Sequence, residues 1–289
     1  MLGSNVPTIG GLTTGFRYGD KWGCQCIQIY ITLSRRWDVL DLSEDTVLQF
    51  KSAWQESSVR EVIAHLPYLA NLASPDKELY LKARNRLIIE LNRAKELGIS
   101  FLVLHPGNHR GSGERSGIQR TVKSLNDAIA KTNNVSTKIL LETMSGQGTE
   151  LGNSFEQIAK ILDQVKDSHR FGICFDTCHV FAAGYGVDTY KGYERTIERF
   201  DKIIGIKKIQ AFHLNDSKGG LGSRIDRHVS IGEGYLGLKC FHAIVKDPRF
   251  IDVPKILEIP KREERSQQNL NLLKRLQGLT RKEVMQDAR

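Results

Sequence analysis

The sequence predicts an α/β fold, a (β/α)8 TIM barrel that forms a single domain over residues 1–289. The length suits this architecture, which typically takes about 250 residues. Short runs rich in β-branched and aromatic residues alternate with amphipathic segments of roughly 12 to 20 residues, a pattern typical of βαβ units on a parallel sheet. A doubly wound open sheet is the alternative, but no early run is followed by the Gly-x-Gly-x-x-Gly that would support it.

Eight runs along the chain are the predicted strands of this barrel. They span residues 2–5, 26–31, 59–64, 100–104, 137–141, 171–175, 208–212 and 254–257. Helices are predicted after Gly10-Gly11, from about Ser43, over 76–97, within 111–131, over 154–165, near 191–203, near 238–246 and over 263–276. Ser43 is a favoured N-cap, and Gly98 suits the left-handed residue that ends a helix. Residues 278–289 are rich in Arg and Lys, and we expect them to form a solvated basic tail.

Charge and composition narrow the class of protein without deciding its function. The formal net charge of +9 fits nucleic acid or an acidic membrane surface as a partner, but it also fits solubility alone. The chain has no run of about 18 apolar residues and no basic and apolar signal region at its start, so we expect neither a membrane span nor secretion. The five cysteines are expected to be reduced, buried and structural, as in a cytoplasmic protein.

Six of the predicted strands end in a residue that can bind a metal ion. These residues are His65, His105, Glu142, Asp176, His213 and Glu258, separated by 34 to 45 residues, which is the length of one βα unit. Because the carboxyl ends of barrel strands face one mouth, we expect the six side chains to converge there. Carboxylates gathered in an apolar mouth would repel each other unless cations bind, and mixed His and carboxylate ligands suit zinc, manganese or iron.

Loop residues add further candidate ligands. His179 follows Asp176 by three residues, and Asp226-x-His228 places two side chains on one face of an extended segment. Nine ligands exceed the four or five that one zinc ion takes, so the pattern predicts a multinuclear site. His109 is expected either to support a ligand or to contact phosphate, whereas His169 and His242 are expected on the surface.

Five sequence blocks resemble the signature motifs of endonuclease IV, a zinc-dependent apurinic/apyrimidinic (AP) endonuclease family of the xylose-isomerase-like barrels. The blocks are HPGNH (105–109), LLETMSGQG (140–148), FDTCHVFAAGY (175–185), HLNDSKGGLGSRIDRH (213–228) and IGEGYLG (231–237). The similarity covers nearly the whole chain. It implies a (β/α)8 barrel, as the alternation of elements also predicts.

The resemblance also implies a site of three zinc ions and a substrate. The first ion would be held by His65, His105 and Glu142, the second by Glu142, Asp176, His213 and Glu258, and the third by His179, Asp226 and His228. A zinc-activated hydroxide, with Glu142 orienting or deprotonating the water, would hydrolyse the phosphodiester 5′ to an abasic site in duplex DNA. The products would be a 3′-hydroxyl and a 5′-deoxyribose phosphate, and the protein would act as a monomer. Arg35, Tyr68 and Leu69 match family positions that enter the base stack.

One loop departs from the family pattern. The first strand of the family usually leads into His-x-Ser-x-Ala-Gly-Gly, whereas this chain has Asn5-Val6-Pro7-Thr8-Ile9 before Gly10-Gly11. We expect this change to affect DNA affinity or substrate preference and to leave the metal chemistry intact.

Two other functions compete with the nuclease. A metal-dependent sugar isomerase or epimerase on the same barrel would use ligands resembling Glu142, Asp176, His213 and Glu258, but it would leave the other five idle. A non-catalytic binder of abasic DNA would hold its metals only as structural ions. Structural zinc sites are usually closed four-ligand cages, which argues against that alternative. Counting the bound zinc ions separates the first alternative from the nuclease.

Overall fold

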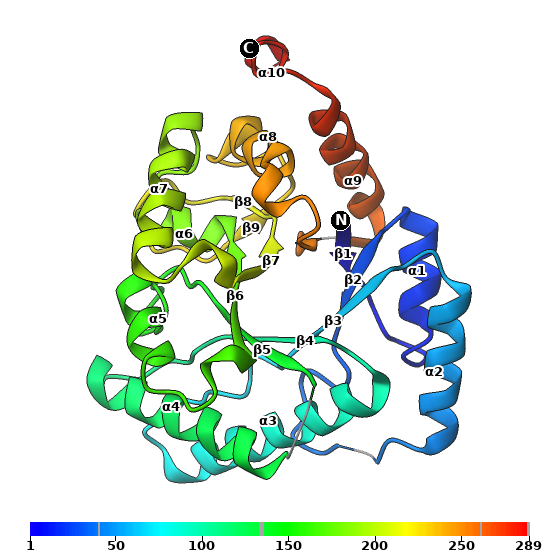
Figure 1. Cartoon of the computed structure of the whole chain (residues 1–289), viewed down its shortest axis with the longest axis vertical. Helices are drawn as coiled ribbons and strands as arrows, with labels where there is room; N and C mark the ends of the chain where they lie inside the picture. Colours follow the sequence, from blue (N-terminus) through cyan, green and yellow to red (C-terminus); the bar gives the residue numbers. More distant parts are fainter. Residues whose placement is uncertain (40, 133–135, 261, 288–289) are drawn as a thin grey trace.

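Eight parallel strands close into a barrel in this computed structural model, which describes residues 1–39, 41–132, 136–260 and 262–287. The strands lie in the order β1-β10-β7-β6-β5-β4-β3-β2. They are β1 (Leu2–Asn5), β2 (Cys26–Ile29), β3 (Glu61–His65), β4 (Phe101–Leu104), β5 (Lys138–Glu142), β6 (Phe171–Asp176), β7 (Ile209–His213) and β10 (Lys255–Leu257). Every predicted strand overlaps one of these, so the predicted fold class is confirmed (Figure 1).

Helices surround the strands, as the alternating pattern predicts (Figure 1). They are α1 (Thr14–Trp22), α2 (Glu44–Glu56), α3 (Lys77–Leu97), α4 (Glu114–Lys131), α5 (Phe155–Leu162), α7 (Tyr190–Ile203), α8 (Gly237–Lys246) and α9 (Arg262–Gly278). Short 3-10 turns occur at η1 (Ser168–Arg170), η2 (Ile206–Lys208) and η3 (Pro248–Phe250). The side chain of Ser43 caps α2 by accepting from the backbone N–H of Thr46, and Gly98 ends α3 at φ 78°.

Besides the 3-10 turns, four elements among the described residues have no counterpart in the sequence prediction. They are α6 (Thr177–Ala182), the two-stranded antiparallel pair β8 (Asp216–Ser217) and β9 (His228–Val229), and α10 (Arg281–Asp287). Residues 281–287 of the expected solvated tail form a helix; residues 281–283, 285 and 286 are exposed, as expected, whereas Val284 is fully buried. Residues 288–289 of that expected tail lie outside the described residues. The pair β8 and β9 and the helix α6 lie beside the barrel mouth and matter for the site.

His242 is not the surface residue that the sequence suggests. It lies in α8 and is buried, and its ring bridges the hydroxyl of Tyr190 (2.9 Å) and the backbone carbonyl of Leu279 (3.1 Å). Both partners are far away in the sequence, and a lone helical His carries no sign of them. His169 is exposed, as predicted.

The core has two layers that fix which residues reach the mouth. Inside the barrel, one small apolar cluster is made of Cys26, Ile63, Val103, Leu140, Cys174, Ala211 and Ile256. A larger apolar cluster lies between the strands and the helices. All five cysteines are buried and free, as expected, and their structural role stays a prediction. Among the described residues, no helix has both the length and the apolar character that crossing a bilayer requires.

Candidate metal centre

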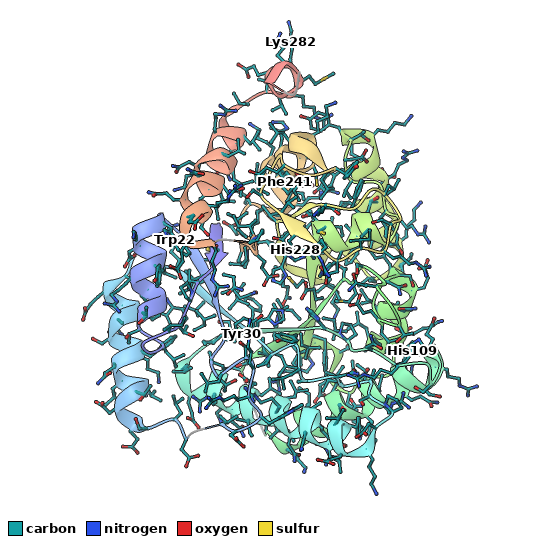
Figure 2. The ribbon with its side chains drawn as sticks, turned by 180° about the vertical axis from the view of Figure 1, so that it is seen from behind. Trp22, Tyr30, His109, His228, Phe241 and Lys282 are labelled. Carbon is teal, nitrogen blue, oxygen red and sulfur yellow. The ribbon has the colours of Figure 1, made fainter. Side chains whose placement is uncertain are left out.

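Side chains alternate along each strand, and this alternation aims the strand-end residues at the mouth. His65, Glu142 and His213 each lie two positions after a residue of the inner apolar cluster, so they share its inward face. These three residues and Asp176 are the last residues of β3, β5, β7 and β6. His105 and Glu258 directly follow β4 and β10. Figure 2 shows His228 and Tyr30 near the middle of the same region.

The first group of candidate ligands contains His65, His105 and Glu142. The Nε2 atoms of the two histidines each lie 3.2 Å from Oε2 of Glu142. Nδ1 of His65 lies 2.7 Å from the backbone carbonyl of Leu66, which can only accept a hydrogen bond, so Nε2 is the nitrogen that would bind an ion. Glu142 is fully buried, His65 is nearly so, and His105 is one-third exposed.

The second group contains Glu142, Asp176, His213 and Glu258. Nδ1 of His213 lies 3.0 Å from Oε1 of Glu142, 3.1 Å from Oε2 of Glu258 and 3.8 Å from Oδ2 of Asp176. The opposite nitrogen of His213 is 2.8 Å from Oε1 of Gln28, which directs the lone pair of Nδ1 toward the carboxylates.

The third group contains His179, Asp226 and His228. Oδ1 of Asp226 lies 3.2 Å from Nε2 of His179 and 3.4 Å from Nε2 of His228, and the two nitrogens are 3.3 Å apart. The Nδ1 atoms face the carbonyls of Thr143 (2.8 Å) and Glu258 (3.2 Å), and that of His179 also lies 3.2 Å from Oε1 of Glu142. The two Nε2 atoms, which face Asp226, are therefore the nitrogens that would bind an ion.

In each of these three groups, all ligand atoms lie within 4.8 Å of one another. Glu142 connects the first two groups, because Oε2 faces one and Oε1 faces the other. The groups have the same members as the ligand sets that the resemblance implies. That these residues bind ions stays a prediction.

The electrostatics of the cluster show why it suits cations. Burial alone would raise the pKa of Glu142, but His213 and His105 beside it hold that pKa well below its ordinary value. Burial would lower the pKa of His179, but Asp176, Asp226 and Glu142 raise it well above its ordinary value. Glu142 thus stays charged beside imidazoles that balance its charge, and a divalent cation would take over this balance on binding. The donors are His and carboxylate side chains, and most of the histidine nitrogens that would not face an ion already form hydrogen bonds. This arrangement fits zinc.

A fourth set of nearby donors includes a thiol. Cys178 lies close to Asp176 and His228. Burial, together with the negative charge of the neighbouring Asp176, raises the pKa of the Cys178 thiol to about 12. The thiol thus stays protonated at neutral pH and competes poorly as a ligand.

Three supporting residues escaped the sequence prediction. Gln28 bonds to both His213 and Glu258, and Asn215 donates to Oδ2 of Asp176 at 2.6 Å. The buried carboxylate of Asp216 accepts four backbone N–H bonds, from Ser217, Gly232, Gly234 and Leu236, at 2.8 to 3.1 Å. Three of these bonds tie residues 232–236 to β8. The glycines of IGEGYLG are the available signal, since a Cβ on Gly234 would overlap this carboxylate.

The residues expected to enter DNA lie around the same mouth. Tyr68 is 64% exposed and lines a cavity of about 600 Å³ with Leu69, His105 and Asp226. Arg35 is exposed but does not line that cavity; its neighbour Trp37 does. His109 accepts from the backbone N–H of Gly113 through Nδ1 at 3.2 Å, a contact that shapes the start of α4. Neither expected role of His109 is tested by this contact.

The altered loop after β1 lies on the rim of the mouth. Asn5 is buried, and its Oδ1 has no hydrogen-bond partner among the described residues. Ile9 is 85% exposed. The loop thus presents a large apolar side chain to solvent.

Comparison with known proteins identifies the family. A family model described as Xylose isomerase-like TIM barrel matches residues 16–276. "Probable endonuclease 4" of Geotalea daltonii is 43% identical over 271 residues, which cover 94% of this chain and 95% of the relative. The chain belongs to the endonuclease IV family. The corresponding protein of Geobacter sulfurreducens is also 43% identical, over 95% of this chain and 94% of its own.

Solved structures agree with this assignment. The crystal structure of endonuclease IV from Thermus thermophilus superposes with a TM-score of 0.84 at 28% identity, and the match covers 95% of this chain and 98% of that one. A D-tagatose 3-epimerase-like protein superposes with a TM-score of 0.75 at 20% identity over 98% of this chain and 99% of that one. At that identity the likeness concerns the fold alone.

Proposed function

We propose that this member of the endonuclease IV family is an AP endonuclease that repairs DNA. It would hydrolyse the phosphodiester 5′ to an abasic site in duplex DNA and leave a 3′-hydroxyl and a 5′-deoxyribose phosphate. The observation that carries the proposal is the set of three adjoining His and carboxylate groups that share Glu142 at the barrel mouth. The relatives named endonuclease 4 support it.

The three groups would hold three zinc ions per chain. His65, His105 and Glu142 would bind the first, Glu142, Asp176, His213 and Glu258 the second, and His179, Asp226 and His228 the third. When bound, the ions would neutralise phosphoryl charge and lower the pKa of water at the site. The carboxylate of Glu142 would orient the attacking water or accept its proton, because its two oxygens reach both of the first two groups.

Exposed side chains around the mouth would recognise the damaged duplex. Tyr68 and Leu69 line the cavity beside His105, and with Arg35 they would fill the gap at the missing base. Extruding a nucleotide costs least where no base is stacked, so selectivity for abasic sites follows. The net charge of +9 would favour the DNA backbone and make affinity salt-dependent. We propose that the protein acts as a monomer in the cytoplasm.

A cleavage assay tests the proposal directly. Zinc-loaded protein is incubated with a duplex oligonucleotide that contains one tetrahydrofuran abasic analogue. We expect a single incision 5′ to the analogue and none in the undamaged duplex. If the wild-type protein cut no faster than Glu142→Ala, the hydrolase proposal would be rejected.

The second group by itself resembles the ligand set of a sugar isomerase or epimerase. Such an enzyme would need one or two ions and would make no use of His65, His105, His179, Asp226 and His228. Zinc analysis distinguishes the two functions, because the nuclease requires about three ions per chain. Binding of abasic DNA without cleavage would instead support the non-catalytic alternative.

A further inference from the structure

The segment that follows β2 is held in place by side chains rather than by regular secondary structure. Residues 30–37, named loop 30–37 here, contain no helix or strand and carry Arg35 and Trp37. The guanidinium of Arg86 donates to the backbone carbonyls of Arg36 (2.8 Å), Leu33 (3.0 Å) and Trp37 (3.3 Å). It also donates to the hydroxyl of Thr32. One buried side chain thus binds four acceptors of this loop.

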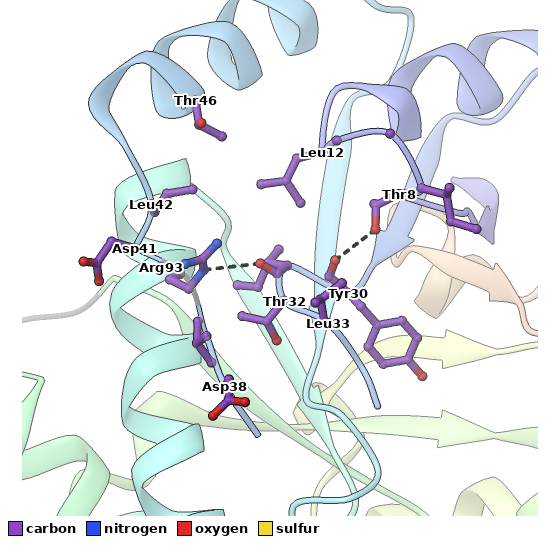
Figure 3. Close-up of a pocket in the computed structure, with 15 residues that line it drawn as sticks. Thr8, Leu12, Tyr30, Thr32, Leu33, Asp38, Asp41, Leu42, Thr46 and Arg93 are labelled. Carbon is purple, nitrogen blue, oxygen red and sulfur yellow. Dashed lines mark hydrogen bonds between the residues drawn. The ribbon is translucent and has the colours of Figure 1, made fainter. Parts of the chain in front are cut away.

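The remaining carbonyls at the start of the loop are bound in a similar way. Nε of Arg93 donates to the carbonyl of Ile31 at 3.2 Å, and the hydroxyl of Thr8 donates to the carbonyl of Tyr30 at 3.3 Å (Figure 3). Arg86 and Arg93 are seven residues apart in α3, so they lie on one face of the helix, two turns from each other. The loop is therefore attached along its length to a single rigid helix.

Glu90 lies between these two arginines and balances their charge. Its Oε1 accepts from Nε of Arg86 at 2.7 Å and from the Thr32 hydroxyl. Arg86 is 1% exposed and Glu90 is fully buried. A buried ion pair contributes little net stability compared with apolar residues, so its main effect here is on the conformation of the loop to which it is bonded. The planar guanidinium can bond several carbonyls at once, which a Lys ammonium cannot match.

We propose that Arg86 is a positioning residue for DNA recognition, which fixes loop 30–37 so that Arg35 and Trp37 are held toward the abasic duplex. Because Arg86 binds the carbonyls on both sides of Arg35, the backbone of this residue is fixed while its side chain remains exposed. Trp37 is held beside the cavity that Tyr68 and Leu69 line. A preordered loop binds more tightly because less conformational entropy is lost on binding. This inference rests on the proposed nuclease function.

The test compares Arg86→Lys with Arg84→Lys, a matched control on the same helix. Arg84 pairs with Asp127 of α4 at 3.0 Å and makes no hydrogen bond to the described residues of loop 30–37. For Arg86→Lys we expect KM for the tetrahydrofuran duplex to rise about tenfold with kcat nearly unchanged, because binding and not chemistry is weakened. Hydrolysis of bis(4-nitrophenyl) phosphate and the zinc content should match the wild type, because the metal groups are untouched.

A mutant cycle shows whether Arg86 acts through Arg35 and Trp37. If it does, adding Arg86→Lys to the variant Arg35→Ala/Trp37→Ala should cause no further loss of affinity for abasic DNA. Additive losses, an unchanged KM in Arg86→Lys, or equal losses on the small phosphodiester would each overturn the positioning role. Thr32→Val removes one acceptor from the loop without removing a charge, and it must raise KM in the same direction even if Arg86→Lys folds poorly.

The outcomes for the two proposals are distinguishable. A wild-type protein that does not cut the abasic duplex would overturn both the nuclease function and the role of Arg86. An active wild-type protein whose KM is insensitive to Arg86→Lys and Thr32→Val would overturn only the role of Arg86.

Discussion

The candidate ligands at the strand ends and those of the third group are positioned by different means. His65, Glu142, Asp176 and His213 are terminal residues of barrel strands, so the parallel sheet itself sets their spacing. Asp226 precedes the short strand β9 and His228 begins it, while His179 lies in the six-residue helix α6. Those two segments lack the support of the barrel sheet and depend on particular hydrogen bonds.

The barrel mouth therefore combines a rigid part, the strand ends, with the third group, whose position depends on particular hydrogen bonds. Removing a neighbouring side chain cannot move a strand end far, because ladder bonds on both sides hold the backbone. The segment with Asp226 and His228 is held by the pairing of β9 with β8, next to which the Asp216 carboxylate fixes residues 232–236, and by single contacts such as the one to Gln147. Loss of these bonds should therefore weaken the third group and spare the first two.

The largest effect should follow from Glu142→Gln, which alters the residue shared by the two strand-end groups. The Gln amide has only one oxygen and cannot offer an oxygen to each of two cations. We therefore expect the binding of both ions to be weakened and abasic incision to fall by at least about 10³-fold. Incision kinetics and zinc analysis measure the change. Glu61→Gln is the matched control, because Glu61 is the first residue of β3 and lies at the end of the barrel away from the mouth. This variant should retain activity. Retention of full activity by Glu142→Gln would contradict the shared role.

The same division explains how far sequence reasoning reached. The strand-end residues could be predicted because each ends an apolar run and the barrel brings all strand ends together, as with His65 and Glu142. The strands β8 and β9 could not be predicted, because two residues carry no periodicity. The contact between Asp216 and the segment after β9 was also missed, since the partners of its carboxylate are backbone amides, which leave no side-chain pattern.

Arg86 shows another limit of sequence reasoning. In α3 it resembles one more charge on a solvated helix face, yet it is buried. Its acceptors are mostly backbone carbonyls of a loop about fifty residues earlier in the chain. Charged residues at Arg86, Glu90 and Arg93, spaced four and three residues apart, lie on one helical face and were the available signal.

The next effect separates two residues that are close together in sequence. Asp176 belongs to the second group, but its Oδ1 also caps α6 by accepting from the backbone N–H of His179 at 2.8 Å. Asp176→Ala should therefore lower zinc content at both the second and third groups, whereas His179→Ala should remove only the third ion. Zinc analysis after dialysis measures the two contents. Equal losses in both variants would contradict the distinction between the two strand-end groups and the third group.

A smaller effect is expected from Asp216→Asn, which alters the attachment of residues 232–236, the segment after β9 of the third group. The amide would turn N–H donors toward backbone N–H groups and lose part of the four-bond contact. Because residues 232–236 directly follow β9, which begins with His228, we expect their loosening to lower the affinity for the third ion by about tenfold. Titration with a chelator of known affinity measures it.

Asp201→Asn is the control for that experiment. Its carboxylate also accepts a backbone N–H, from Ile206 at 2.7 Å, but in the connection between α7 and η2 rather than in the β8–β9 segment. This variant should bind zinc like the wild type. If Asp216→Asn weakened all three ions alike, the strand-end groups would depend on the loop, and the proposed independence of the two parts would be wrong.

The smallest effect should come from Gln147→Ala, because this residue holds the third group at its exposed edge. Its side-chain Oε1 accepts from the backbone N–H of Asp226 at 3.1 Å, while its backbone N–H donates to the carboxylate of Glu150. A single solvent-exposed hydrogen bond contributes about 1 kcal/mol, so the third ion should bind about fivefold more weakly. Zinc content at saturating metal should be unchanged, and Gln49→Ala on α2 serves as the control. If the loss were as large as that of Asp216→Asn, the contact of Gln147 with Asp226 would matter as much as the contacts of Asp216 with residues 232–236. The proposed order of the two effects would then be wrong.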